Sequence, residues 1–100
     1  MAITKNGNSV YVDTTGQVTT TGKPVFLHYL VYTTSAAGDT LTLKDTDNSG
    51  NVKMTIKHNT ATDSLWLDFS ESPIRFPGGI YCSAISASSL ALVVISDGAA

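Results

Sequence analysis

The 100-residue chain is short of charge and of cysteine, and both shortages restrict what it can be. Only 14% of its residues are charged, against about a quarter in an average soluble domain. Six lysines and arginines and a net charge of −2 leave no basic stripe for phosphates, which argues against a nucleic-acid partner. Cys82 is the single cysteine, so we expect neither an internal disulfide nor a cysteine-based zinc site.

Long hydrophobic runs and strong helix formers are also scarce. No apolar run approaches the ~18 residues of a membrane span, and the first residues lack the hydrophobic stretch of a secretion signal. We therefore expect synthesis in the cytoplasm and no membrane partner. Glu, Gln and Arg are few, and no segment repeats apolar residues with helical spacing. A short helical turn within 82–93 is the one helical alternative.

Threonine, serine and period-two alternation of apolar residues are abundant instead, and they favour β-structure. Glycine-, asparagine- and aspartate-rich turns interrupt the alternating runs at short intervals, among them residues 6–8, 47–50 and 77–79. The predicted strands are 9–13, 17–21, 24–33, 39–45, 51–57, 63–69, 73–76, 79–86 and 90–96. Eight or nine short strands at this spacing indicate a sandwich or a barrel. We predict an all-β fold, an antiparallel β-sandwich, for which a jelly roll is one arrangement.

Two organisational features accompany this fold. Residues 1–22, rich in Thr, Gly and Asn, are predicted to form an N-terminal arm or an edge hairpin, and residues 23–100 a single sandwich domain. The strands at 24–33 and 90–96 are apolar on both faces. A strand of that kind must be covered on both sides, either by the N-terminal segment or by a neighbouring subunit.

The candidate interface follows from strict alternation along two strands. In 24–33 one face holds Val25, Leu27, Tyr29 and Val31, and the other holds Phe26, His28, Leu30 and Tyr32. In 63–69 the alternating leucines point to the core, which turns Trp66 outward. Exposed tryptophan is enriched at binding patches, although a loop or arm of the same chain can also cover it. The predicted interface residues are Phe26, His28, Leu30, Tyr32 and Trp66.

Motifs for catalysis or metal binding are weak. Residues 45–50 look like the opening of an EF-hand loop, but Ile56 stands where the bidentate glutamate belongs, so we predict a hairpin turn. His28 and His58 are the only imidazoles, and no Gly-x-Ser-x-Gly elbow is present. Cys82 is predicted to be a buried, inert thiol. The acidic residues Asp63, Asp68 and Glu71 are interpreted as solvated. We expect no enzymatic activity, catalytic residue, cofactor or metal site.

Three segments carry a resemblance to a known class of protein. They are Gly-Lys-Pro-Val-Phe-Leu at 22–27, the turn at 34–38 leading into 41–45, and Pro-Ile-Arg-Phe-Pro-Gly-Gly-Ile-Tyr at 73–81. Residues 23–95 resemble the small β-sandwich virion proteins of tailed bacteriophages, of the capsid-decoration or cement type. The resemblance implies a structural virion protein that binds the outer surface of the head and stabilises it. It also implies a homotrimer whose other partner is the major capsid protein or another virion protein, and it brings no catalytic residues.

The rival hypothesis is a carbohydrate-binding or receptor-binding module of a phage tail fibre or spike. In that case Trp66 and either Tyr32 or Tyr81 would form a stacking platform for a sugar, with Asp and Asn side chains binding its hydroxyls. An enzyme would need a pocket that joins a histidine to a carboxylate, and the sequence does not indicate one.

Overall fold

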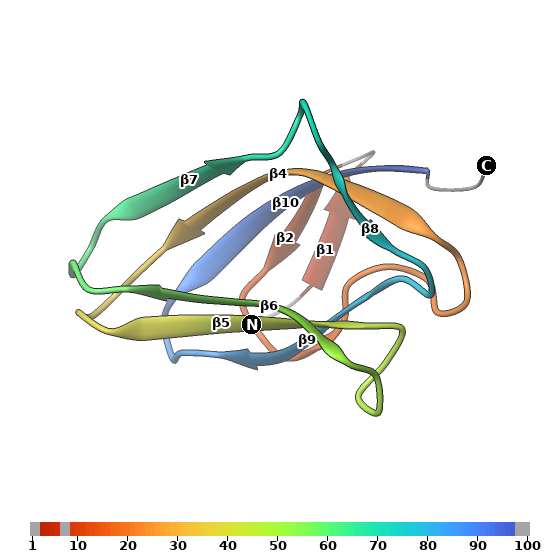
Figure 1. The fold of residues 1–100 in the computed structure, drawn as a ribbon. Helices are drawn as coiled ribbons and strands as arrows, with labels where there is room; N and C mark the ends of the chain where they lie inside the picture. The colour runs from red at the N-terminus through yellow and green to blue at the C-terminus, as the bar shows by residue number, and fades with distance from the viewer. Residues whose placement is uncertain (1–2, 7–8, 98–100) are drawn as a thin grey trace.

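The computed structural model describes residues 3–6 and 9–97, and the described residues form ten antiparallel strands and no helix (Figure 1). The predicted turn at 6–8 lies partly outside the described residues. In chain order the strands are β1 (Ile3–Asn6), β2 (Ser9–Val12), β3 (Gly16–Gln17), β4 (Val25–Thr33), β5 (Asp39–Asp45), β6 (Val52–His58), β7 (Ser64–Asp68), β8 (Ile74–Phe76), β9 (Ile80–Ile85) and β10 (Leu90–Asp97). The predicted all-β sandwich is confirmed, with ten strands instead of eight or nine.

The positions of most strands agree with the predicted ones to within one or two residues. Two differences stand out: no strand range was predicted before residue 9, and the predicted strand at 17–21 shrinks to the two residues of β3. Of the two predictions for residues 1–22, an arm or an edge hairpin, the antiparallel pair of β1 and β2 at the edge of its sheet corresponds to the hairpin. The strands predicted at 79–86 and 90–96 form as β9 and β10, and the alternative helical turn within 82–93 does not form. Between β9 and β10 the chain reverses in a turn, where Ser88 has a φ of 66°. A single residue in the left-handed region suits a tight reversal and does not start a helix.

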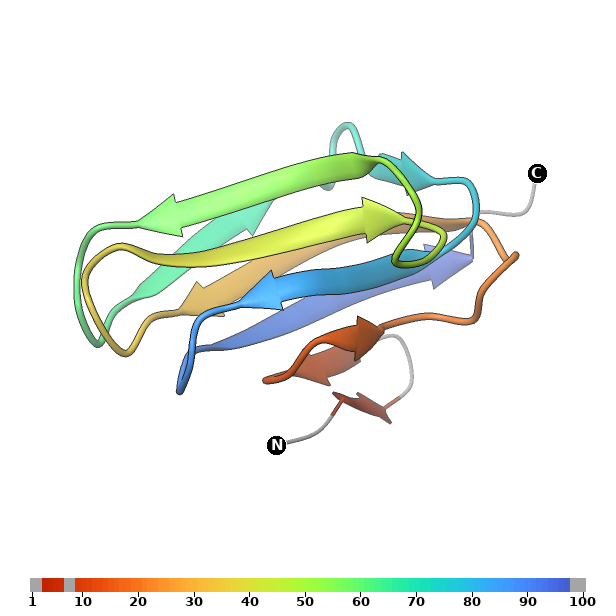
Figure 2. The same ribbon diagram turned by 90° about the horizontal axis from the view of Figure 1, so that it is seen from below.

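The strands form two sheets packed face to face. Sheet A has the order β1-β2-β10-β4-β7, with β8 also paired to β4, and sheet B has the order β3-β9-β5-β6. The strand pairs are nested along the chain, from β2–β10 outermost, through β3–β9 and then β4 with β7 and β8, to β5–β6 innermost. Successive nested pairs alternate between sheet A and sheet B, and this is the strand order of a jelly roll. Figure 2 shows the two layers from the side of sheet B.

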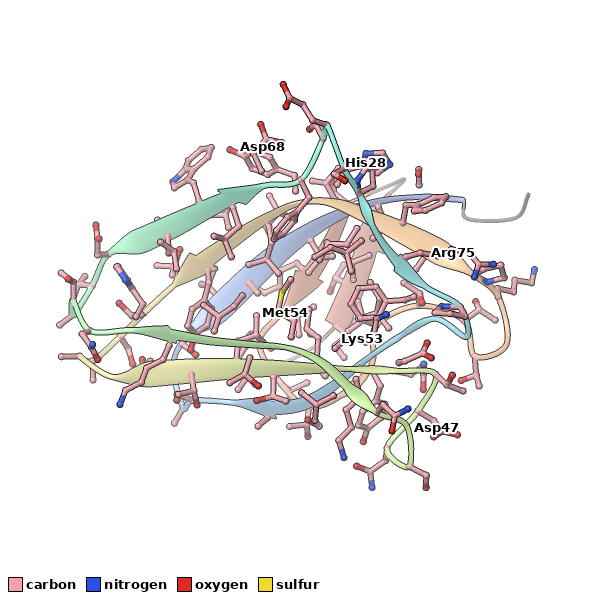
Figure 3. The ribbon with its side chains drawn as sticks, in the orientation of Figure 1. His28, Asp47, Lys53, Met54, Asp68 and Arg75 are labelled. Atoms are coloured by element: carbon pink, nitrogen blue, oxygen red, sulfur yellow. The ribbon has the colours of Figure 1, made fainter. Side chains whose placement is uncertain are left out.

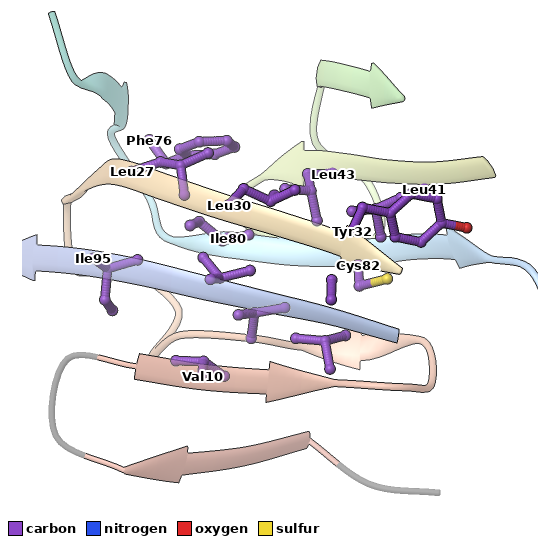
Figure 4. Packing of buried hydrophobic residues seen from close by; sticks show 14 of the residues in the cluster. Val10, Leu27, Leu30, Tyr32, Leu41, Leu43, Phe76, Ile80, Cys82 and Ile95 are labelled. Carbon is purple, nitrogen blue, oxygen red and sulfur yellow. The ribbon is translucent and has the colours of Figure 1, made fainter. Parts of the chain in front are cut away.

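One hydrophobic core fills the space between the sheets (Figure 4). Its fully buried members come from both layers and include Leu27, Leu30, Tyr32, Leu41, Leu43, Phe76, Ile80, Cys82 and Val93. Val10 and Val12 of β2, and Val18 just after β3, are buried in the same cluster. The N-terminal segment therefore contributes strands and core residues to the sandwich.

A β-bulge in β4 changes which of its residues face the core. Tyr29 pairs with Val94, but the next pair along is Leu27 with Ile95, so His28 is an extra residue in the ladder. A bulge shifts the side-chain alternation by one. Val25 and Leu27 are buried before the bulge, and Leu30 and Tyr32 after it. The prediction that Leu30 and Tyr32 face outward is wrong, because strict alternation takes no account of the extra residue.

Candidate functional site

The outer face of sheet A, turned away from sheet B, carries a continuous apolar row. Tyr11 in β2 lies opposite Leu92 in β10, Leu92 lies opposite Val31 in β4, and Val31 lies opposite Trp66 in β7. We call these four residues the outer row. Trp66 is 64% exposed, Tyr11 38% and Leu92 37%, so no described segment of the chain covers them. The row crosses four strands without a charged side chain.

Trp66 is held in a defined orientation although it is exposed. Its ring meets the ring of Tyr29 edge-on, with 5.6 Å between centroids and 85° between planes. This arrangement is favourable for aromatic pairs. Tyr29 lies on the outer face because of the bulge at His28, which exchanges the orientations of Tyr29 and Leu30. The sequence placed Trp66 correctly, but it missed Tyr29 as the neighbour of Trp66 on the outer face.

A hollow adjoins the exposed tryptophan at the end of β7. It has a volume of about 330 Å³ and is lined by Asp68, Phe69, Glu71 and Ser72. Asp68 lies directly opposite Tyr29 across the β4–β7 ladder. Figure 3 shows Asp68 on the side of sheet A that faces away from sheet B. The lining thus contains two carboxylates, and one of them, Asp68, pairs across the ladder with Tyr29, the residue that contacts Trp66.

The Asp68 carboxylate is stabilised in its charged form. Hydrogen bonds from the Ser70 side chain and from the Ser70 backbone N–H, the latter at 2.9 Å, lower the pKa of Asp68 below its ordinary value. The carboxylate is therefore ionised at neutral pH. The backbone N–H of Phe69 donates to the carbonyl of His28 at 2.8 Å, which ties the start of this loop to the β4 bulge.

Phe26 and His28 occupy the far end of β4, apart from the outer row. Phe26 lies opposite Ser96 of β10 on one side and Arg75 of β8 on the other. The Phe26 and His28 rings contact edge-on with 6.5 Å between centroids, and His28 Nε2 lies 2.6 Å from the Ser96 hydroxyl. Of the five predicted interface residues, Phe26, His28 and Trp66 are accessible on the outer side, whereas Leu30 and Tyr32 belong to the core.

Several other titratable groups have local partners. His58 Nε2 lies 2.9 Å from Asp63 Oδ2, and this hydrogen bond is the main cause that lowers the pKa of Asp63. The pair spans the turn between β6 and β7. In the sequence, only the five-residue spacing of His58 and Asp63 could have indicated that they form an ion pair. The Asp45 carboxylate accepts from the Gly78 N–H at 3.0 Å. Burial raises the pKa of the Cys82 thiol to about 11, which makes this thiol unreactive at neutral pH.

Metal ligands do not cluster in the part of the chain that the structure describes: it brings no three His, Cys, Asp or Glu side chains into a group able to hold an ion. The same residues include no helix long and apolar enough to cross a bilayer. Comparison of the chain with family models, with curated proteins and with solved structures finds no match. The outer row and the adjoining hollow are therefore the features on which a function can be based.

Proposed function

We propose that this protein is a structural protein of a tailed-bacteriophage virion, which decorates the capsid by binding the outer surface of the head and stabilises it. The observation that carries the proposal is the outer row. Four side chains from four strands, two of them aromatic, lie side by side on one face of the molecule, and three of them, Tyr11, Leu92 and Trp66, are exposed. Large accessible aromatic side chains such as Tyr11 and Trp66 are typical anchors of protein interfaces.

The two outer faces of the sandwich differ in a way that suits attachment to a surface. The outer face of sheet B carries Thr42, Thr55 and Lys57, all accessible to solvent. The outer row of sheet A carries no charge, so burying these four side chains costs little desolvation. A particle protein of this kind would place sheet A against the capsid and sheet B toward solvent. Many copies on one particle turn a modest contact into strong collective attachment.

Replacing Trp66 with aspartate tests this assignment. Trp66→Asp puts a charge on the most exposed member of the outer row and should weaken binding to phage heads that lack the protein by about thirtyfold, the equivalent of a ~2 kcal/mol hot spot. The measurement is co-sedimentation of purified protein with such heads. Thr55→Asp, on the outer face of sheet B, adds the same charge and should bind normally. Unchanged binding by a folded Trp66→Asp protein would contradict the assignment.

A second candidate function, a carbohydrate-binding or receptor-binding module of a tail fibre or spike, is favoured by the hollow beside Trp66. A sugar ring stacked on Trp66 would bring its hydroxyls toward Asp68 and Glu71, whose carboxylates accept hydrogen bonds. The stacking platform differs from the predicted one. Tyr32 is fully buried and Tyr81 belongs to sheet B, so Tyr29 is the aromatic neighbour of Trp66.

A glycan array followed by calorimetric titration distinguishes the two functions. Saturable binding of a glycan that Trp66→Ala abolishes and Tyr11→Ala retains would favour the carbohydrate module. Tyr11 is the matched control because it is an exposed aromatic side chain on the same face but three strands away from Trp66 and the hollow. Absence of any glycan signal, together with binding to phage heads, would favour capsid decoration.

A further inference from the structure

Strand β7 leaves one row of its backbone hydrogen-bonding groups facing away from β4. The Phe69 N–H donates to the His28 carbonyl, and the Thr34 N–H donates to the Asp63 carbonyl. In an antiparallel ladder the backbone groups of alternate residues point to the same side. The odd-numbered residues of this segment therefore pair with β4. The N–H and C=O groups of Ser64, Trp66 and Asp68 point toward the open edge of sheet A, where no described strand pairs with β7.

The other sheet edges in the described part of the chain are shorter or better protected. On the sheet B edge, β6 carries exposed Lys53 and Lys57 and a register shift at Lys53, two devices that oppose edge pairing. The Lys53 side chain also lies over the Phe76 ring, 5.9 Å from its centroid, at the margin between the sheets (Figure 3). Strand β3 has two residues, β8 three and β1 four. The edge of β7 has five residues and carries neither lysine nor proline.

The geometry points to β7 as the contact between two copies of this chain: we propose that β7 pairs antiparallel with β7 of a second copy about a twofold axis at Trp66. This register sets Trp66 opposite its symmetry mate, as a pair that exchanges both backbone hydrogen bonds. Ser64 then lies opposite Asp68 of the other copy, and Leu65 opposite Leu67. An isologous contact requires a surface that is complementary to itself, and the sequence Ser-Leu-Trp-Leu-Asp meets that requirement.

Charge and hydrogen bonding favour this register over its neighbours. The twofold axis keeps the two Asp68 carboxylates at opposite ends of the pair, each beside a serine hydroxyl. A shift that centres the pair on Asp68 would set the two carboxylates against each other, which is unfavourable. The Ser64 N–H already donates to the Asp63 carboxylate. The contact therefore relies on the hydrogen bonds between the backbones of the two Trp66 residues. It also relies on the hydrogen bond from each Asp68 N–H to the Ser64 carbonyl of the other copy.

This contact would join two copies of sheet A into one continuous sheet and double the area of its outer face. The inference goes beyond the proposed function and does not depend on it, and it gives a twofold pair in place of the trimer that the resemblance implies. A five-residue strand is about 17 Å long, which is small for an interface. The pair is therefore expected to be reversible and to depend on protein concentration.

Sedimentation equilibrium of the purified full chain tests the proposal, at concentrations from about 10 μM to about 1 mM where weak interfaces are populated. The unmodified chain should convert from monomer to dimer. Ser64→Lys places a lysine opposite Asp68 of the other copy and should keep or strengthen the dimer. The double variant Ser64→Lys/Asp68→Lys places lysine opposite lysine at both ends and should weaken association by about tenfold or more.

The opposite responses of the two variants identify the register, because a general effect of added charge would weaken both. Circular dichroism establishes that each variant is folded. A monomer at every concentration, a trimer, or equal weakening by the single and double variants would overturn the proposal. These outcomes are independent of capsid binding. A monomer that binds phage heads refutes only the β7 contact, and a dimer that does not bind them refutes only the proposed function.

Discussion

At the scale of single residues, Tyr32 shows how a buried polar group is accommodated in this core. Its single hydroxyl hydrogen is shared between two acceptors, the Thr40 carbonyl and the Ser89 hydroxyl oxygen, both at 2.9 Å, near the end of the sandwich where β4 meets the β9–β10 turn. The Ser89 hydroxyl in turn donates to the Ser86 carbonyl at 2.6 Å. Figure 4 shows the ring between the sheets, with its oxygen pointing toward this end. The residue is therefore a core residue that also fixes a loop.

Removing the Tyr32 hydroxyl should destabilise the protein measurably. Tyr32→Phe removes the hydrogen bond to the Thr40 carbonyl, which keeps the Ser86 N–H as a partner, and should lower the free energy of unfolding by about 1 kcal/mol. Urea denaturation followed by circular dichroism measures the change. Tyr11→Phe removes a hydroxyl from the exposed outer face and should have little effect. Equal stability of Tyr32→Phe and the unmodified chain would show that the buried hydrogen bonds contribute nothing net.

At the scale of one element, the bulge in β4 connects the core to the candidate site. The extra residue, His28, lets Leu27 and Leu30 both face the core, and it turns Tyr29 toward Trp66 on the outer face. Without it, alternation would put either the residues before the bulge or those after it on the wrong side. Since β4 lies between β10 on one side and β7 and β8 on the other, an error in its phase would propagate to both neighbours.

Deleting His28 should therefore prevent folding, whereas replacing it should not. The deletion turns large core side chains outward, either those after the bulge, such as Leu30 and Tyr32, or those before it. The free energy of unfolding should fall by about 5 kcal/mol or more, which matches the whole stability of a small domain. His28→Ala keeps the residue count and loses the contact with the Ser96 hydroxyl, at a cost of about 1 kcal/mol. Thermal melting of the two variants compares them. A deletion variant that melts cooperatively near the unmodified chain would contradict the structural role of the bulge.

At the scale of the whole molecule, carboxylates fix the loops at one end of the sandwich. Asp39 accepts hydrogen bonds from the backbone N–H groups of Ala36 and Ser35 at 3.0 and 2.8 Å, and from the Ser35 hydroxyl, which lower the pKa of Asp39. Asp63 binds His58 at the neighbouring turn. The Gly38 N–H donates to the His58 carbonyl, which joins the two loops.

These interactions make the stability of the protein sensitive to acid. A carboxyl whose pKa is lower in the folded chain stabilises the fold above its ordinary pKa and loses that contribution as pH falls through the folded pKa. The ordinary value is 3.8 for Asp39, so the free energy of unfolding should hold between neutral pH and about pH 5 and then fall toward pH 2. Urea titrations across this range measure it. Asp39→Asn should reduce the slope below pH 4, and an unchanged slope would contradict the role of Asp39.

Features that depend on local chemistry could be predicted from the order of the amino acids. Alternation predicted the all-β class, the ranges of most strands and the outward direction of Trp66, because each follows from neighbouring residues along one strand. Features that depend on pairing between distant segments became known from the folded structure. The bulge that reverses Leu30 and Tyr32 becomes visible only in the register with β10, and β1 exists only because β2 gives it a partner. The nested strand order leaves the outer row uncovered and the edge of β7 open, since strand order is set by contacts that periodicity along the chain does not encode.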